Sequence, residues 1–297
     1  MDRLVRGHGT KEQYYLLFLA ITNKCSLNCA HCYEWDFLNK KESLSKDAIF
    51  DIVKKYQQKN LGQIFFTGGE PLNRFDTLIK ILPSVKDAET WIISSGWHLT
   101  EDKATALKAN GLTGALISLD HYVEEKHDEF RGLPKSYYWA LLALKNAQSA
   151  GLITALSLCP TNEFIESNSF APYMKMAQSL GVKFVQIIEP KPEGRNFDGD
   201  LVLTSSNKRK LENLFNEFNS GKIYRSFPII IYTDYLKRLY GCEGVYERHR
   251  YIDTKGIEHP CPFCKMPDDT STINFSEKLK SNGCRCTFQM EKARMEI

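Results

Sequence analysis

Residues 14–33 read YYLLFLAITNKCSLNCAHCY, an apolar run followed after two residues by three closely spaced cysteines, Cys25, Cys29 and Cys32. The run Tyr14–Thr22 has the length and the apolar and aromatic content of a strand buried on both faces. Because the cysteines follow it directly, we expect three thiols to project from one loop at the carboxyl end of that strand. In barrels of parallel strands this end carries the chemistry.

The pattern of a short apolar run followed by a longer amphipathic segment repeats along the first 220 residues. It predicts β/α units with right-handed crossovers, which curl into an open version of the (β/α)8 barrel. Five further strands are predicted at Gln63–Thr67, Trp91–Ser95, Gly114–Leu119, Ile153–Cys159 and Val182–Ile188. Helices are predicted at Ser45–Lys59, Leu72–Leu82, Thr100–Ala109, Ser136–Ala150, Phe170–Leu180 and Ser206–Ser220. The fold class is therefore α/β, with a partial (β/α)6 TIM-like barrel over residues 1–220.

Residues 221–297 differ from the repeats before them. Short strand-like pieces at Ile229–Thr233 and Arg248–Ile252 alternate with turns, and five cysteines crowd this part of the chain: Cys242, Cys261, Cys264, Cys284 and Cys286. A core this thin needs a bound metal to be stable. The sequence predicts a small cysteine-rich α+β domain here.

The composition of the 297-residue chain is that of a folded globular protein, with 42% hydrophobic and 25% charged residues. The formal net charge is only +3, so we expect no nucleic-acid partner. No run approaches the roughly 18 apolar residues of a membrane span, and the first residues are too polar for a signal peptide, so we expect a cytoplasmic protein. Nine cysteines in such a chain indicate metal binding or catalysis rather than disulfides.

The number of clustered cysteines is informative. A structural zinc ion needs four ligands, whereas a cubane iron–sulfur cluster held by Cys25, Cys29 and Cys32 leaves one iron open to another ligand. The alternative is a zinc site completed by His31 or by a distant cysteine. The spacing alone leaves both interpretations open.

The C-x3-C-x2-C motif, with Tyr33 after it, resembles the radical S-adenosylmethionine (SAM) superfamily. The second predicted strand ends in Thr67-Gly68-Gly69-Glu70-Pro71, which matches the GGEP motif that binds the methionine amino group of SAM in that family. The third predicted strand ends in Ser94-Ser95-Gly96, and the fourth ends in Ile117-Ser118-Leu119-Asp120. The segment His127–Gly132 follows and contains Arg131.

The resemblance implies cofactors and roles. The cofactors are a [4Fe-4S] cluster on the three cysteines and SAM beside it. Gly68 and Gly69 would let the backbone approach SAM closely, and Glu70 would accept a hydrogen bond from its amine. The resemblance assigns contacts with the polar end of SAM to Ser118 and Arg131, and further SAM or cluster contacts to Ser95 and Tyr33.

The C-terminal cysteines resemble the SPASM or twitch extension that follows many radical SAM barrels, through the spacing Cys242-x13-Gly256-x4-Cys261. This resemblance implies one auxiliary [4Fe-4S] cluster, with ligands drawn from Cys242, Cys261, Cys264, Cys284 and Cys286. A four-cysteine zinc site is the alternative for this region.

The function that we expect is a radical SAM oxidoreductase that modifies a peptide or protein by crosslinking, oxidation or epimerisation. An electron donor such as flavodoxin or ferredoxin would be its partner. The alternatives are an enzyme of the same family that acts on a small metabolite, and a non-catalytic metal-stabilised binding protein. Cys159 ends the fifth predicted strand, where its thiol could return a hydrogen atom to a substrate radical; the alternative is a small buried side chain.

Overall fold

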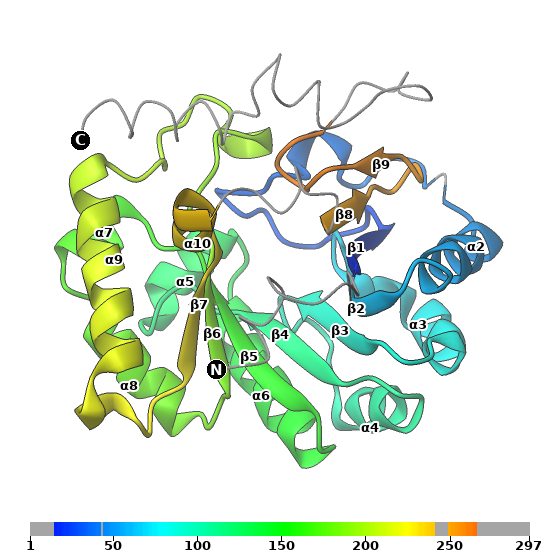
Figure 1. Ribbon diagram of the computed structural model, residues 1–297, viewed down its shortest axis with the longest axis horizontal. Helices are drawn as coiled ribbons and strands as arrows, with labels where there is room; N and C mark the ends of the chain where they lie inside the picture. Colours follow the sequence, from blue (N-terminus) through cyan, green and yellow to red (C-terminus); the bar gives the residue numbers. More distant parts are fainter. Residues whose placement is uncertain (1–14, 43, 241–248, 266–297) are drawn as a thin grey trace.

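The computed structural model describes residues 15–42, 44–240 and 249–265, and one curved sheet organises them (Figure 1). The sheet has nine strands in the order β7-β6-β5-β4-β3-β2-β1-β8-β9. All neighbours pair in parallel except β8 and β9, which are antiparallel. The strands are β1 (Tyr15–Thr22), β2 (Leu61–Gly68), β3 (Glu89–Ser94), β4 (Gly114–Ser118), β5 (Ile153–Leu158), β6 (Phe184–Ile187), β7 (Ile229–Tyr232), β8 (His249–Ile252) and β9 (Glu258–His259).

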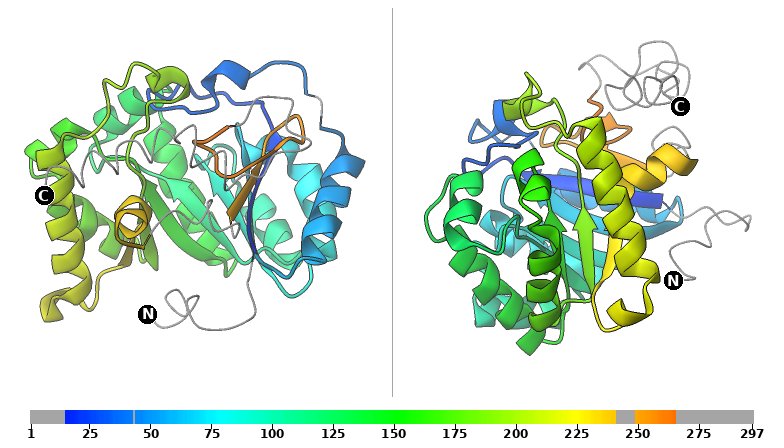
Figure 2. Two further views of the ribbon diagram at one scale, coloured as in Figure 1. Left: turned by 45° about the horizontal axis from the view of Figure 1, so that its top comes forward. Right: turned by 90° about the vertical axis from the view of Figure 1, so that its left-hand side faces the viewer.

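The helices that follow the strands cover the outer face of this sheet (Figures 1 and 2). The α-helices are α2 (Lys46–Gln57), α3 (Phe75–Ile81), α4 (Glu101–Ala109), α5 (Glu124–Arg131), α6 (Ser136–Ser149), α7 (Asn162–Glu166), α8 (Phe170–Ser179), α9 (Ser205–Ser220) and α10 (Thr233–Tyr240). The short 3-10 helices are η2 (Trp35–Phe37), η3 (Pro71–Arg74), η4 (Leu82–Ser84), η5 (Gly194–Asn196) and η6 (Lys222–Tyr224). The main hydrophobic core lies between strands and helices and includes Leu17, Ile64 and Ile117.

Local sequence signals explain where several helices begin. Ser45 precedes α2, and its hydroxyl accepts a hydrogen bond from the backbone N–H of Ala48 at 3.1 Å. Thr100 and Thr204 cap α4 and α9 in the same way. Each cap satisfies one of the backbone donors that a helix leaves without a partner in its first turn.

The six predicted strands and the predicted α/β partial barrel are confirmed, with shifts of a few residues at the strand ends. The predicted helix Leu72–Leu82 is shorter, because η3 occupies Pro71–Arg74 and α3 begins at Phe75. Helices α5, α7 and α10 were not predicted. The residues that α5 buries are the polar His127 and Arg131, so its sequence lacks the apolar periodicity of a core-facing helix.

The sheet continues beyond the six predicted strands at both edges. Strand β7 pairs with β6, and β8 pairs with β1, so eight of the described strands run parallel. Residues 229–232 and 249–252 therefore extend the barrel sheet, although they lie beyond the predicted domain boundary at residue 221. The division into domains 1–220 and 221–297 stays a prediction, since residues 241–248 and 266–297 lie outside the described part.

The attachment of β8 brings the C-terminal part of the chain against the loop that carries the cysteines. The hydroxyl of Tyr251 donates a hydrogen bond to the buried carboxylate of Glu34, which also pairs with Lys265 at 2.8 Å. At this edge of the sheet, Glu258 of β9 forms an ion pair with Lys55 of α2 at 3.2 Å. No helix in the described ranges is both long and apolar enough to cross a bilayer.

Tyr251→Phe tests this attachment. Removing the hydroxyl leaves a buried carboxylate with one donor fewer, which we expect to cost about 1–3 kcal/mol of unfolding free energy. For a protein of this size, each kcal/mol lowers the melting temperature by about 2–4 °C. The control is Tyr138→Phe, at an exposed position on α6. Equal melting temperatures of the two variants, measured by circular dichroism, would contradict the account.

Candidate active site

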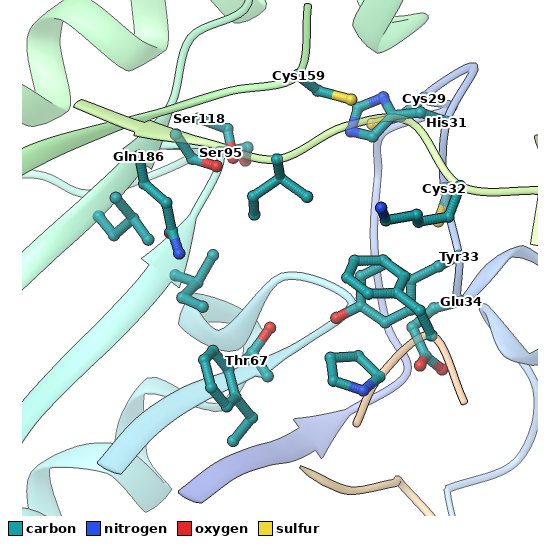
Figure 3. Close-up of a pocket in the computed structure, with 18 of the residues that line it drawn as sticks. Cys29, His31, Cys32, Tyr33, Glu34, Thr67, Ser95, Ser118, Cys159 and Gln186 are labelled. Carbon is teal, nitrogen blue, oxygen red and sulfur yellow. The ribbon is translucent and has the colours of Figure 1, made fainter. Parts of the chain in front are cut away.

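One cavity of about 210 Å³ lies at the carboxyl ends of the parallel strands (Figure 3). Its wall contains all the SAM, cluster and catalytic residues predicted in the first 220 residues of the sequence. These are Cys25, Cys29, Cys32, Tyr33, Gly68, Gly69, Glu70, Ser95, Ser118, Arg131 and Cys159. Residues up to 134 positions apart in the sequence (25 to 159) are thus brought to one site, while the role of each stays a prediction.

The loop that carries the three cysteines, residues 23–34, is held first by the end of β2. The backbone N–H of Gly69 donates to the carbonyl of Thr22 at 2.7 Å, and that of Glu70 donates to the carbonyl of Lys24 at 2.8 Å. Gly68 has φ +132°, and a Cβ atom at this position would lie 2.1 Å from the Thr22 oxygen. Only glycine permits this approach, so the motif glycines have a structural function even before any ligand binds.

The same cysteine loop is held on a second side by the end of α5. The N–H groups of Asn28 and Ala30 donate to the carbonyls of Arg131 and Phe130 at 3.0 and 2.9 Å. Gly132 ends α5 in the left-handed conformation, and a Cβ there would lie 2.4 Å from the Asn28 oxygen. The end of α5 therefore fits directly against the loop.

The segment after β6 holds the third side of the cysteine loop. The backbone N–H of Arg195 donates to the carbonyl of Cys32 at 2.9 Å, and its guanidinium donates to Asn28 Oδ1 at 2.9 Å. The guanidinium also lies 4.6 Å from the ring centroid of Trp35, within cation–π range. Three separate elements thus fix the loop in place.

The three thiols of the loop are free of disulfides and differ in exposure. Cys29 is buried, and Cys25 and Cys32 are half-buried. Burial raises the pKa of Cys25 and Cys32 to about 12, and it raises the pKa of Cys29 as well. The Arg131 Nη1 atom lies 3.8 Å from Cys29 Sγ, and its charge favours the thiolate. A metal bound by these thiols would supply the remaining drive for deprotonation, since coordination removes the proton from a thiol.

The geometry bears on the zinc alternative for this loop. In the described ranges, no three Cys, His, Asp or Glu side chains converge tightly enough to hold a single metal ion. A mononuclear zinc site places four ligands about 2.0–2.3 Å from the metal. His31, the candidate fourth ligand, stacks on Phe130 with ring centroids 4.6 Å apart. His31 is thus engaged with Phe130, while the thiols of Cys25, Cys29 and Cys32 line the shared cavity.

Glu70 is buried and is engaged by four protein donors. Its Oε1 accepts from the Leu72 N–H at 3.2 Å and from the Ser94 hydroxyl at 2.8 Å. Its Oε2 accepts from the Ser95 N–H at 2.9 Å and from the Ser95 hydroxyl at 2.6 Å. Burial raises the pKa of Glu70, while these hydrogen bonds oppose the shift. Because a carboxylate has about four acceptor positions, a ligand amine must share or replace a serine donor.

Arg131 and Asp120 form a buried ion pair behind the cysteine loop. Arg131 Nε lies 2.5 Å from Asp120 Oδ2, and the other carboxylate oxygen accepts the backbone N–H of Cys159 at 2.9 Å. The Arg131 charge holds the pKa of Asp120 below its usual value against desolvation. The pair joins the ends of β4 and β5 to the cysteine loop. The sequence pattern around Asp120 does not indicate this role.

Tyr33, Ser118 and Cys159 complete the predicted set. The Tyr33 ring packs edge-on against Phe263 at 5.2 Å, and burial raises its pKa. Cys159 is buried, and desolvation raises the pKa of its thiol well above the usual value, so the S–H form is favoured. Figure 3 shows its sulfur on the side of the cavity where Cys29 and His31 lie. Both earlier interpretations of Cys159, a buried side chain and a hydrogen donor, fit this position.

A second buried ion pair, absent from the sequence prediction, forms the wall where β6 and β7 end. Lys191 Nζ lies 2.8 Å from Asp234 Oδ1, with both side chains 7% exposed. Asp234 Oδ2 accepts the backbone N–H of Glu189 at 2.9 Å. Although desolvation raises the pKa of Asp234, the charge of Lys191 and the hydrogen bonds to the carboxylate lower it to about 2. No local sequence signal marks this pair, because its members are 43 residues apart (191 to 234) and meet only through the pairing of β6 with β7.

Of the five C-terminal cysteines, Cys261 and Cys264 lie in the described part. They flank a tight turn in which the Cys264 N–H donates to the Cys261 carbonyl at 3.1 Å. Pro262 and Phe263, between them, line the cavity. Cys242, Cys284 and Cys286 lie outside the described residues, so the predicted auxiliary cluster stays a prediction.

Comparison with known proteins identifies the family of the barrel. The model of the Radical SAM superfamily matches residues 19–166. Among curated proteins, a GTP 3',8-cyclase of Clostridium perfringens (strain SM101 / Type A) is 28% identical over 202 residues, which cover 65% of this chain and 60% of the relative. The chain thus spans about three fifths of the length of this relative.

Solved structures share the fold at low sequence identity. Streptococcus suis SuiB bound to its precursor peptide SuiA matches with a TM-score of 0.68 and 14% identity, covering 90% of this chain and 63% of SuiB. The protein anSMEcpe with bound AdoMet matches with a TM-score of 0.66 and 18% identity, covering 89% of this chain and 82% of that protein. At these identities the likeness concerns the fold.

Gly68→Ala tests the contact between β2 and the cysteine loop. The added Cβ would overlap the Thr22 carbonyl, so we expect the loop to be displaced and the unfolding free energy to fall by about 2 kcal/mol or more. Gly111→Ala is the matched control, because Gly111 also has positive φ but its nearest atom would be 3.9 Å away. Denaturant unfolding of the two variants measures the difference. A Gly68 variant no less stable than the Gly111 variant would refute a steric role.

Asp234→Asn tests the ion pair with Lys191. The pKa of Asp234 in the folded protein is lower than in the unfolded chain, so its stabilisation is present above about pH 4 and is lost as the pH falls toward 2. We expect the stability gap between parent and variant to narrow by about 2 kcal/mol over that window. Chemical denaturation at several pH values, with the exposed Asp76→Asn as control, provides the measurement. A pH-independent gap would contradict the assignment.

Proposed function

Because the chain belongs to the Radical SAM superfamily through residues 19–166, we propose that it is an enzyme that cleaves SAM reductively and uses the resulting radical on a substrate. The observation that carries the proposal is the convergence of three free thiols, from Cys25, Cys29 and Cys32, on one cavity at the carboxyl ends of the strands. Family membership implies a [4Fe-4S] cluster and SAM as cofactors. The three thiols fit a cluster with one open iron.

The bound cluster and SAM would supply a 5′-deoxyadenosyl radical able to abstract hydrogen from an unactivated position. The protein's own residues hold and orient the ligands. We assign the cluster to Cys25, Cys29 and Cys32, and we assign the amine of SAM to the β2 end, where Glu70 fixes the orientation of Ser94 and Ser95.

The remaining assignments place SAM between the ends of β2 and β4. We assign backbone contacts with SAM to Gly68 and Gly69, and contacts with its polar end to Ser118. Arg131 stabilises the carboxylate of SAM and the Cys29 thiolate together, since its guanidinium already lies beside Cys29. Tyr33 covers the ligands from the side of Phe263.

For the substrate, we propose a peptide or protein side chain, with crosslinking, oxidation or epimerisation as the outcome. Cys159 would serve as hydrogen donor in the epimerisation case, since burial keeps its thiol protonated. A flavodoxin- or ferredoxin-type protein would deliver the electrons. A small metabolite is the second candidate, and the similarity to a GTP 3',8-cyclase favours it.

An auxiliary [4Fe-4S] cluster would adjoin the cavity. We propose its ligands among Cys242, Cys261, Cys264, Cys284 and Cys286. The support comes from Cys261 and Cys264, which share one turn that contacts Tyr33 through Phe263. A cluster on this turn would lie close enough to the substrate cavity to accept an electron from a substrate radical.

Replacing Cys25, Cys29 and Cys32 together by Ala tests the proposal. After anaerobic reconstitution we expect about eight irons per parent chain and about four in the variant, since each cubane contains four. With dithionite and SAM, the parent is expected to form 5′-deoxyadenosine and the variant none. The control is Tyr138→Phe, at an exposed position on α6 outside the cavity, which is expected to keep both the iron content and SAM cleavage.

Other outcomes of this experiment would indicate a different function. About one zinc per chain with little iron would overturn the radical mechanism. Bound iron without 5′-deoxyadenosine would indicate a non-catalytic binding protein. Stimulation of SAM cleavage by GTP, and by no peptide, would favour the metabolite.

A further inference from the structure

The inner face of the barrel is built in two layers. Leu116, Ala155 and Phe184 are register partners on β4, β5 and β6 and belong to a small apolar cluster. Side chains alternate along a strand, so residues two positions further point to the same inner face. That next layer is Ser118, Ser157 and Gln186, which are again register partners and line the cavity. The inner face of the barrel thus has an apolar layer and, next to it on the side of the cavity, a polar layer.

The side chains of the polar layer have no hydrogen-bond partner within the part of the chain that the structure describes. Among the described residues, the side chains of Ser157 and Gln186 make no hydrogen bond, whereas Ser94 and Ser95 are both bonded to Glu70. Figure 3 shows Gln186 extending into the cavity from the side opposite Tyr33 and Cys32. A half-buried carboxamide has two N–H donors and one acceptor to satisfy. Such groups in a cavity point to a ligand or water.

His249, at the start of β8, supplies an independent observation. It lines the same cavity, is only 9% exposed, and its Nε2 has no hydrogen-bond partner in the described structure. Its ring lies against Phe18 with centroids 4.8 Å apart, which fixes its plane. Burial lowers the pKa of His249 to about 3, which favours a neutral imidazole beside the cavity.

We propose, on the basis of the proposed function, that Gln186 with Ser157 and His249 recognises the substrate through an amide edge, an N–H group beside a carbonyl. The Gln186 carboxamide presents a donor and an acceptor side by side, which pair with an amide through two hydrogen bonds. All three side chains are uncharged, and they suit a neutral group. A peptide bond and the lactam edge of a guanine both present this chemistry.

The test measures binding to the reconstituted protein with SAM present, by anaerobic equilibrium dialysis. The probes are guanosine for the lactam source and N-acetylglycine N-methylamide for the peptide source. Each is paired with an analogue in which methyl groups replace the amide N–H. We expect one of the two probes to bind, and its methylated analogue to bind about tenfold or more weakly, since a site built around a hydrogen bond rejects a ligand lacking it.

Gln186→Leu is expected to weaken binding of that probe about tenfold. The matched control is Gln178→Leu on the exposed side of α8, which should bind as the parent does. Gln186→Glu, which keeps the side-chain shape and one acceptor but loses the donor, guards against a folding defect and should also bind weakly. The proposal that Gln186 recognises an amide edge is overturned if neither probe binds, if methylation has no effect, or if both Gln186 variants bind like the parent.

Formation of 5′-deoxyadenosine in the absence of substrate separates this proposal from the proposed function. If the parent and the Gln186 variants form 5′-deoxyadenosine equally, and only the variants fail to bind the probe, the role of Gln186 in substrate recognition is supported. If the parent forms none, the proposed function itself fails.

Discussion

The structure depends on how the cysteine loop, residues 23–34, is held at the carboxyl end of the sheet. Elements distant in sequence bond to its backbone from three sides: the end of β2, the end of α5 and the segment after β6. All three contacts require glycine, at Gly69, Gly132 and Gly194, because a Cβ at each position would overlap a carbonyl of the loop. The backbone of the loop is therefore bonded to the barrel on three sides, and its three cysteines line the cavity.

This constraint explains the charges buried around the site. Arg131 supports the loop through its backbone carbonyl, lies beside Cys29 through its guanidinium, and is balanced by Asp120. On the opposite wall, Lys191 and Asp234 neutralise each other where β6 and β7 end. Buried pairs of this kind contribute little net stability, but removing one partner is costly because the other charge remains. They fix the walls of the cavity in one arrangement and leave the uncharged polar layer between them for recognition.

The sequence predicted the parts of this site that rest on local pattern. Alternating apolar runs marked β1 to β6, and the cysteine spacing and Gly68-Gly69-Glu70 marked the loop and the end of β2. It did not predict helix α5, since the helix buries His127 and Arg131 in place of apolar side chains. It also missed the pairing of β7 and β8 with the sheet edges, because strand pairing depends on contacts distant in the sequence. For the same reason the Asp234–Lys191 pair and the shared layer of Ser157 and Gln186 became visible only in three dimensions.

The central claim is that the thiols of Cys25, Cys29 and Cys32 hold a cluster whose open iron binds SAM. Electron paramagnetic resonance of the reduced, reconstituted protein tests it most directly, with and without SAM. The account predicts the spectrum of a reduced [4Fe-4S] cluster whose g-values change when SAM is added, because a ligand enters the iron's coordination sphere. A cluster spectrum that SAM leaves unchanged, or the absence of any cluster signal, would contradict it.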